Sequence, residues 1–239
     1  MTFFSLSPEI DDLKLNLHKL PRVLVVTAIL GLTWADAYAW ETRLDEDGIL
    51  VQSRLTSGAK YEEFRVETEI VATMAQAIAL LEDASACTQW LFRCKESQII
   101  RETSATERLF YQVTSLPFPA KSRDSIFHAT ITFEGRASAR VTMSSMPDEI
   151  PLTKHVRIRE AFGTYILEPT GENKLRVIWQ QYVDPGGALP SWLVNSILTE
   201  LPFKSLQAFR ELVQQSPYRD ARLVYGPDGT PTDISFTDS

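Results

Sequence analysis

The chain has 239 residues and a formal net charge of −7 at pH 7. Hydrophobic residues make up 44% and charged residues 23%, which is the balance of an ordinary globular protein. The acidic excess argues against a general nucleic-acid-binding protein, which would present a basic surface. No linker rich in glycine and serine, charge block or internal repeat divides the chain, so we expect one large domain with a segment on either side of it.

The first 39 residues have the pattern of a targeting segment. An almost entirely apolar run, Val23–Trp34, follows Lys19 and Arg22 and precedes Ala37-Tyr38-Ala39. A basic flank, a short apolar core and small residues at its end are typical of a secretory signal peptide, and the run is shorter than the roughly 20 residues that span a bilayer. We expect residues 1–39 to be a signal peptide cleaved near Ala39, and the protein to be exported to the periplasm or cell envelope. An uncleaved N-terminal anchor or packed helix is the alternative.

The region between residues 40 and 91 has the pattern of three strands followed by two helices. Between the first two strands, the turn Asp45–Gly48 places glycine where a positive φ is needed. Thr73 is a suitable N-cap for the first helix. We expect strands at 40–44, 49–55 and 64–71 and helices at 74–81 and 85–91, the second of which carries Trp90.

Cys87 and Cys94 are the only two cysteines of the chain. A structural zinc site needs four ligands, and no histidine spacing around this pair supplies the missing two. We expect two buried thiols, with a disulfide between them as the alternative. Sequence motifs of nucleotide-binding, serine-hydrolase and zinc-protease sites do not occur, and we expect neither a metal nor a cofactor.

A stiff extended segment, Leu116–Asp124, joins two expected strands. Pro117 and Pro119 fix the backbone, remove two amide donors and disfavour helix in the residue before each of them. At the end of the segment, Arg123 and Asp124 place opposite charges side by side where the next strand begins. We interpret them as a structural ion pair that helps to set the register of that strand.

The second half of the chain continues with strands and ends in a helix. The expected strands are 97–102, 108–115, 125–133, 139–146, 155–167 and 174–183, which makes nine in all. Strands in this order, with helices only in the middle and at the end, predict an α+β protein with an antiparallel sheet. The last helix begins near Pro190 and has an apolar stripe that starts with Leu193, Ile197 and Leu201. Residues 220–239 lose the pattern and are expected to form a loose tail.

Five short motifs follow one another along the chain. They are Asp47-Gly48-Ile49, a helix that ends near Trp90, Pro117-Phe118-Pro119 with Arg123-Asp124, Asp184-Pro185-Gly186-Gly187, and Pro190-x-Trp192-Leu193-x-Asn195. In this order they resemble the START lipid-binding family of the SRPBCC (Bet v 1-like) superfamily, over residues 40–219. The resemblance implies a helix-grip fold, in which a curved antiparallel sheet wraps around a long C-terminal helix and leaves an internal hydrophobic cavity. It also implies binding or transfer of a lipid or another hydrophobic small molecule without catalysis.

Large side chains on the expected sheet and last helix are candidates for the wall of such a cavity. The candidate ligand-binding residues are Trp90, Tyr111, Phe127, Ile131, Glu160, Tyr165, Trp179, Gln181, Trp192, Leu193 and Ile197. If the strand alternates regularly, Glu160 lies on the same face as Ile158 and Phe162, so we expect its carboxylate on an apolar face. There it needs a partner such as Arg123, Gln181 or a ligand head group. A β-bulge near Gly163 that turns Glu160 outward is the alternative.

As partners we expect a hydrophobic ligand and a transient membrane contact, but no nucleic acid, and we expect a monomer. The glycine pair at 186–187 and Pro202 predict that the first half of the last helix is a movable lid. Two other functions stay open. A cyclase-like or hydrolase-like enzyme on the same fold would use Glu160, Arg123 and His128 as converging acid–base groups. A membrane-tethered interaction module would have a filled core in place of the cavity.

Overall fold

The computed structural model describes residues 39–134 and 138–236. The predicted signal peptide or anchor, apart from its last residue, lies outside the described residues, so its cleavage near Ala39 stays a prediction. Among the described helices, none is both long and apolar enough to cross a membrane.

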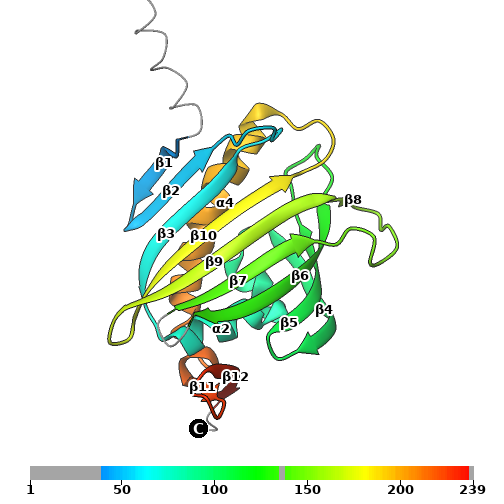
Figure 1. Ribbon diagram of the computed structural model, residues 1–239. Coiled ribbons are helices and arrows are strands. Elements are labelled where there is room, and N and C mark those ends of the chain that lie inside the picture. Colours follow the sequence, from blue (N-terminus) through cyan, green and yellow to red (C-terminus); the bar gives the residue numbers. More distant parts are fainter. Residues whose placement is uncertain (1–38, 135–137, 237–239) are drawn as a thin grey trace, which may run out of the picture. The chain divides into compact units, whose positions relative to one another are not determined.

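One large antiparallel sheet forms the body of the described chain and curves around a long helix (Figure 1). The strand order along the sheet is β1-β2-β3-β10-β9-β7-β6-β5-β4, and the short β8 pairs in parallel with β6 beside this path. The strands are β1 (Glu41–Glu46), β2 (Ile49–Arg54), β3 (Glu63–Val71), β4 (Cys94–Ser104), β5 (Glu107–Thr114), β6 (Arg123–Glu134), β7 (Ser138–Ser145), β8 (Val156–Arg157), β9 (Glu160–Gly171) and β10 (Lys174–Asp184). The nine expected strands are present, and the one expected at 155–167 is divided into β8 and β9.

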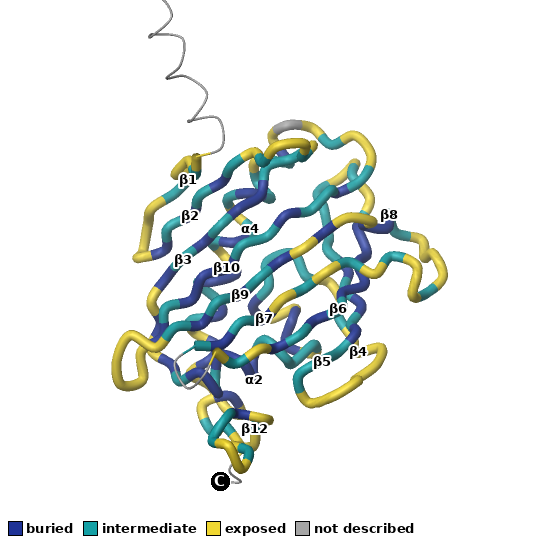
Figure 2. The backbone as a smooth tube through the Cα atoms, viewed as in Figure 1, coloured by how far each residue is buried: buried dark blue, intermediate teal, exposed yellow. Residues whose placement is uncertain are grey.

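The alternation of side chains explains why these segments form a sheet with one packed face. In β3, Phe64, Val66, Thr68 and Ile70 are buried, while Arg65, Glu67 and Glu69 between them are more exposed. Figure 2 shows the same change between buried and more exposed positions along the central strands. The turn between β1 and β2 contains Asp47 and Gly48, both at positive φ, as the sequence predicts for this hairpin.

Three helices connect or cover the strands. The first, α2 (Met74–Glu82), begins with a capping box in which Thr73 and Gln76 exchange side-chain and backbone hydrogen bonds. A 3₁₀ turn (Ala84–Ala86) leads into the short α3 (Cys87–Trp90). The long α4 (Ser191–Leu212) packs against β2, β3 and α3, and buries Leu206 and Phe209 almost completely. Burial of such side chains contributes about 1.5–3 kcal/mol each. The helix-grip fold implied by the resemblance is therefore confirmed.

The centre of the packed face is an aromatic cluster on three neighbouring strands. Trp179 of β10 stacks on Tyr165 of β9 with ring centroids 5.1 Å apart, and meets Phe64 of β3 edge-on at 4.8 Å. The indole Nε1 of Trp179 donates to Oε1 of Gln181 at 3.0 Å, which satisfies its polar atom inside the core.

Arg123 and Asp124 are both buried, but the predicted ion pair between them is wrong. Neighbouring residues of a strand point to opposite faces of the sheet, so the two side chains cannot meet. Asp124 instead accepts hydrogen bonds from Nε and Nη2 of Arg157, at 3.1 and 3.0 Å, and from Oγ1 of Thr153 at 2.7 Å. Burial opposes the charged form of Asp124, yet the bonds from Arg157 and Thr153 lower its pKa. The ion pair of Asp124 with Arg157 thus anchors β6 to a residue distant in the sequence.

Arg157 also fixes the long loop between β7 and β8. Its guanidinium donates to the backbone carbonyls of Pro147, Ile150 and Pro151. The loop thereby covers the face of β5 and β6 that points away from α4. There Ile150 packs against a small second cluster, which consists of Leu109, Tyr111, Val113 and Ile126. Both faces of β5 are therefore packed.

The segment predicted as a loose tail is a hairpin. It consists of β11 (Ala221–Tyr225) and β12 (Pro231–Phe236), and a 3₁₀ turn (Tyr218–Asp220) precedes it. Ala221 is completely buried, and the hydroxyl of Tyr218 donates to Oδ2 of Asp83 at 2.6 Å. An isolated two-stranded hairpin is marginal in water, so packing on α2 is what stabilises this one, and the local sequence does not reveal that contact.

We expect Asp124→Ala to lower the free energy of unfolding by about 3–5 kcal/mol, because it leaves the buried Arg157 without its carboxylate. Urea denaturation measures the change. Asp148→Ala is the matched control, since Asp148 is 82% exposed and pairs with Arg159 at the surface. That variant should change stability by less than about 0.5 kcal/mol. A small change in both variants would show that the Asp124 pair is not a structural anchor.

Candidate functional site

A mostly apolar pocket lies between α4 and the sheet. Its walls come from β5, β6, β7, β9 and β10, from the segment 81–92, and from the first half of α4. The cavity volume is about 180 Å³, and part of the pocket is open to solvent. A concave apolar pocket with few polar groups is the usual form of a small-molecule site.

Most of the predicted ligand-binding residues line this pocket. The seven that do are Trp90, Phe127, Ile131, Tyr165, Trp179, Gln181 and Ile197. They come from α3, β6, β9, β10 and α4, which only the tertiary fold brings together. Four other candidates lie elsewhere.

Tyr111 points to the opposite face of β5. The pocket-facing residues of this strand include Phe110 and Gln112, whereas Tyr111 is buried under the loop that Arg157 fixes. The sequence shows the alternation but not which face is which, because both faces of β5 are covered. On α4, Trp192 is 56% exposed and Leu193 is buried, and neither of them lines the pocket.

The expectation that Glu160 lies on a buried apolar face is also wrong. Glu160 and Phe162 are both exposed, and the buried residues of β9 are Ala161, Gly163, Tyr165 and Leu167. The pairing of β9 with β10 runs without a register shift through this region, so ordinary alternation, rather than a bulge at Gly163, turns Glu160 outward.

A charged pair in the pocket wall was not predicted from the sequence. Nη2 of Arg108, on β5, donates to Oε1 of Glu82 at the end of α2, and Nη1 donates to the Glu82 carbonyl at 3.3 Å. The side chains of Arg108 and Glu82 are only 13% and 19% exposed. Arg108 lies on the same face of β5 as Phe110 and Gln112. The alternation along this strand would therefore have placed Arg108 in the pocket if the pocket face had been known.

Burial raises the pKa of Glu82 to about 7. The Arg108 guanidinium opposes this increase, whereas the carboxylates of Asp233 and Glu102 add to it. The pair therefore changes its net charge near neutral pH, inside a mostly apolar pocket.

Arg123 is a second cationic group in the pocket wall. Its Nε and Nη2 donate to the carbonyls of Pro185 and Gly186, both at 3.0 Å, and burial lowers the pKa of its guanidinium. Arg123 pairs with Thr114, six residues along β5 from Arg108. At about 3.3 Å per residue, the two arginines are roughly 20 Å apart along the sheet. The polar groups thus occupy two separate places.

Arg123 also holds the turn between β10 and α4. In this turn the backbone N–H of Gly186 donates to Oδ1 of Asp184 at 2.8 Å. Gly186 and Gly187 have φ of 64° and 67°, a conformation that residues with a Cβ rarely adopt. Glycine at these two positions is therefore required by the backbone geometry of the turn between β10 and α4.

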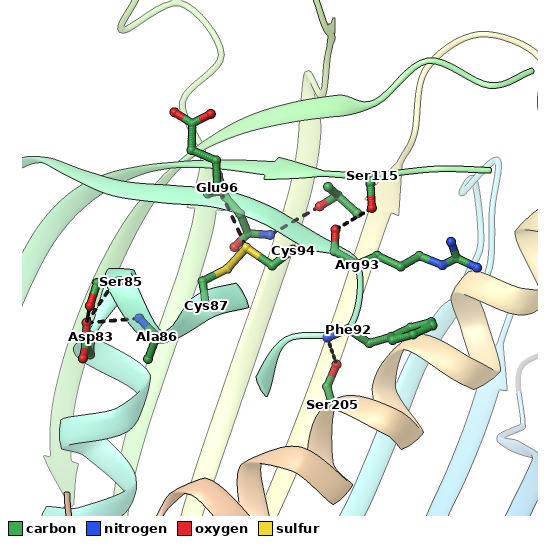
Figure 3. The surroundings of a disulfide bond; sticks show 12 residues. Asp83, Ser85, Ala86, Cys87, Phe92, Arg93, Cys94, Glu96, Ser115 and Ser205 are labelled. Atoms are coloured by element: carbon green, nitrogen blue, oxygen red, sulfur yellow. Dashed lines mark hydrogen bonds between the residues drawn. A yellow bond between two sulfur atoms is a disulfide. The ribbon is translucent and has the colours of Figure 1, made fainter. Parts of the chain in front are cut away.

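A disulfide joins Cys87 of α3 to Cys94 at the start of β4 (Figure 3). The expectation of two buried thiols is wrong, because the turn at 91–93 brings the Cα atoms of the two cysteines to 5.9 Å, within reach of an S–S bond. Figure 3 also shows the backbone N–H of Phe92 donating to Oγ of Ser205 on α4. The segment 83–94, one wall of the pocket, is thus attached to both the sheet and α4.

The comparison with known proteins agrees with this geometry. Residues 33–219 match the START domain. The chain belongs to the START domain family. The match ends where the hairpin of β11 and β12 begins, so the hairpin lies beyond the matched START region.

Two proteins similar to this chain are named as lipid transfer proteins, and a third is an uncharacterized protein. The structure of a STAR-related lipid transfer protein from Xanthomonas axonopodis is 34% identical, with a TM-score of 0.68, and the match covers 74% of this chain and 99% of that one. Phosphatidylcholine transfer protein from Homo sapiens is 26% identical over 65% of this chain and 75% of its own length. The uncharacterized protein PA1579 of Pseudomonas aeruginosa is 29% identical over 82% of this chain and 98% of its own.

No cluster of three or more histidine, cysteine, aspartate or glutamate side chains able to hold a metal ion occurs within residues 39–134 and 138–236. The polar side chains of the pocket wall include Glu82, Arg108, Arg123 and Gln181.

We expect the stability of this START domain to fall as pH rises from about 4.5 to about 7. In this range the folded state binds a proton at Glu82 more tightly than the unfolded state does, so raising the pH favours unfolding. The contribution should be about 2–3 kcal/mol, and Glu82→Gln should remove it. Urea denaturation of both proteins at several pH values measures it. Parallel stability curves for the two proteins would rule out the raised pKa.

Proposed function

We propose that this START domain binds one lipid or similar hydrophobic molecule in the pocket under α4 and transfers it without catalysis. The observation that carries the proposal is the mostly apolar pocket between α4 and the sheet. The lipid transfer proteins among its relatives support the same function.

Burial of apolar surface supplies the affinity in this proposal. Each Å² of apolar surface removed from water contributes about 25 cal/mol, so burying about 300 Å² of acyl chain contributes about 7 kcal/mol. The stacked Tyr165 and Trp179 and the side chains of Phe127, Ile131 and Ile197 provide this surface. The few polar groups of the wall then orient the ligand.

The polar groups favour an amphiphile over a plain hydrocarbon. Glu82 and Arg108 form a charged pair in the wall, and Arg123 lies about 20 Å from Arg108 along the sheet. Buried charges are costly unless they are paired or hydrogen-bonded, and a polar head group adds partners for them. A hydrocarbon offers none.

The turn that Arg123 holds is the proposed hinge of a lid. Gly186 and Gly187 can adopt large changes in φ and ψ, and Pro202 removes one backbone hydrogen bond from α4. Trp192, exposed on the first turn of α4, is suited to a transient membrane contact while the lid is open. Hydrogen exchange tests the lid: residues 186–200 should exchange faster than β10 and slow down when lipid binds.

The alternative of an enzyme loses its original support. Of its three candidate groups, Arg123 lies in the pocket wall, Glu160 is exposed on the other face of the sheet, and His128 pairs with Glu107 at 2.7 Å, also away from the pocket. Glu82, whose pKa is near neutral, is the group that a catalytic role would have to use. The pocket also counts against an interaction module with a filled core.

Native mass spectrometry of the purified protein, with extraction of its ligand, tests the proposal. We expect one lipid per chain and, after incubation with vesicles of that lipid, transfer to acceptor vesicles. The extracted lipid should keep its mass after prolonged incubation. A lipid converted to a product in wild type but not in Glu82→Gln would establish the enzyme instead. A protein that takes up no lipid would overturn the proposal.

We also propose that the protein is exported as a monomer. The order of basic, apolar and small residues at 14–39 supports export, and so does the disulfide of Cys87 and Cys94, since disulfides persist in oxidising compartments. We expect the protein in the cell-envelope fraction, with Trp40 as its first residue and with both cysteines unreactive to maleimide until a reductant is added. An intact Met1 on protein from the cytoplasm would contradict this.

A further inference from the structure

Arg123 is a buried cation without a carboxylate partner. It lines the pocket and is only 6% exposed. Its three guanidinium nitrogens donate to the backbone carbonyls of Pro185, Lys121 and Gly186, which carry no net charge. Within residues 39–134 and 138–236, no acidic side chain forms an ion pair with it. Arginine is rarely this buried unless its charge is paired, so the positive charge of Arg123 calls for an explanation.

Two other arginines with largely buried side chains do have a carboxylate partner. Arg108 pairs with Glu82 in the same pocket, and Arg157 pairs with Asp124 on the other face of the sheet. At Arg123 burial opposes the charge and lowers the pKa of the guanidinium, and no carboxylate counteracts this effect. Arg123 therefore differs from an arginine whose charge is neutralised inside the protein.

The guanidinium of Arg123 lies at the edge of the pocket. Its Nε bonds to the carbonyl oxygen of Pro185 at 3.0 Å, and Tyr61 lies near enough to act on its charge. Pro185 and Tyr61 both line the pocket. Each terminal nitrogen of an arginine carries two N–H groups, and the structure gives one bond to each of them among the described residues. The second N–H of each nitrogen is available to a ligand.

The pocket positions next to Arg123 are polar. On β5, Thr114 lies opposite Arg123 and Gln112 lies opposite Ser125, and all four residues line the pocket. Opposite residues are about 5 Å apart and alternate residues of one strand about 7 Å, so the four positions form one patch. The hydroxyl of Ser125 has no partner among the described residues, yet protein atoms do not cover it completely. It can therefore donate to a ligand in the pocket.

This patch lacks a negative charge. The acidic side chains of the pocket wall, Glu62, Glu82 and Asp83, are bonded to groups other than Arg123. A neutral ligand would leave the charge of Arg123 uncompensated, and a cationic ligand would be repelled. An oxyanion supplies the missing charge and accepts hydrogen bonds from both the guanidinium and the hydroxyl of Ser125. Charge-assisted hydrogen bonds of this kind are about twice as strong as neutral ones.

We propose that Arg123 and Ser125 bind the anionic head group of the lipid, an inference that rests on the proposed function. The charged oxygens belong to a phosphate or a carboxylate of the ligand. From this patch the acyl chain extends along Phe127 and Ile131, which lie on the same face of β6 and line the pocket. The site therefore selects anionic lipids over neutral lipids with the same chains.

The test uses two matched pairs of lipids, which also distinguish the two sources of the charge. Phosphatidylglycerol vesicles that contain diacylglycerol with the same chains test the phosphate. A fatty acid and the fatty alcohol of the same length, supplied together in solution above neutral pH, test the carboxylate. Native mass spectrometry measures which member of each pair the protein takes up. We expect wild type to prefer the anionic member of at least one pair by about tenfold.

Two substitutions of Arg123 separate its charge from its bonds to the turn. Arg123→Gln removes the charge and should abolish the preference for the anionic lipid, whatever its effect on overall affinity. Arg123→Lys keeps the charge but cannot reproduce the three bonds to carbonyls, and it should keep most of the preference. Loss of the preference in both variants would assign the effect to the turn and contradict a head-group site.

Lys60→Gln is the matched control, because it also removes one positive charge beside the pocket. The side chain of Lys60 is 62% exposed and lies 3.9 Å from Asp184. This variant should keep the preference. Equal uptake of both members of each pair by wild type, or an unchanged preference in Arg123→Gln, would overturn the inference and leave the proposed function standing. A wild type that takes up no lipid at all would overturn both.

A measurement on wild type alone avoids any effect of a substitution on folding. Salt screens exposed charges strongly and buried charges much less. The preference for the anionic lipid should therefore persist when the salt concentration is raised from low to about 0.5 M. A preference that disappears in high salt would point to attraction at the surface and contradict binding at the buried Arg123.

Discussion

The buried carboxylate of Asp124 is the interaction on which much of the architecture depends. It holds Arg157, and through the remaining N–H groups of Arg157 it holds the loop that covers the outer face of β5 and β6. Because neighbouring residues of a strand face opposite ways, Arg123 reaches the other side and holds the turn before α4. Two consecutive residues therefore fasten the two layers that lie on either side of the sheet.

The pocket exists because the sheet curves around α4 without closing onto it everywhere. The second half of α4 packs against the sheet through Leu206 and Phe209. Its first half, with Val194, Ile197 and Leu198, lines the pocket. The wall at 83–94 is kept in place by the disulfide and by Ser205.

Charge is distributed sparsely in this pocket. Each charged group in its wall is bonded, Glu82 to Arg108 and Arg123 to two carbonyls, which reduces the cost of burying it. Among the described residues, the indole N–H of Trp90 and Nε of Arg93 are buried donors without a hydrogen-bond partner.

The sequence by itself determined the strands, the capped helix α2, the long α4 and their order, because these depend on local alternation, capping and turn residues such as Thr73 and Gly48. It also identified the family, through short motifs whose spacing reflects one fold. Only the tertiary structure decided which face of β5 meets the pocket, that Asp124 pairs with Arg157 and that Glu82 meets Arg108. Likewise the hairpin of β11 and β12 depends on its packing against α2. These outcomes join residues distant in the chain, and alternation alone cannot tell two covered faces apart.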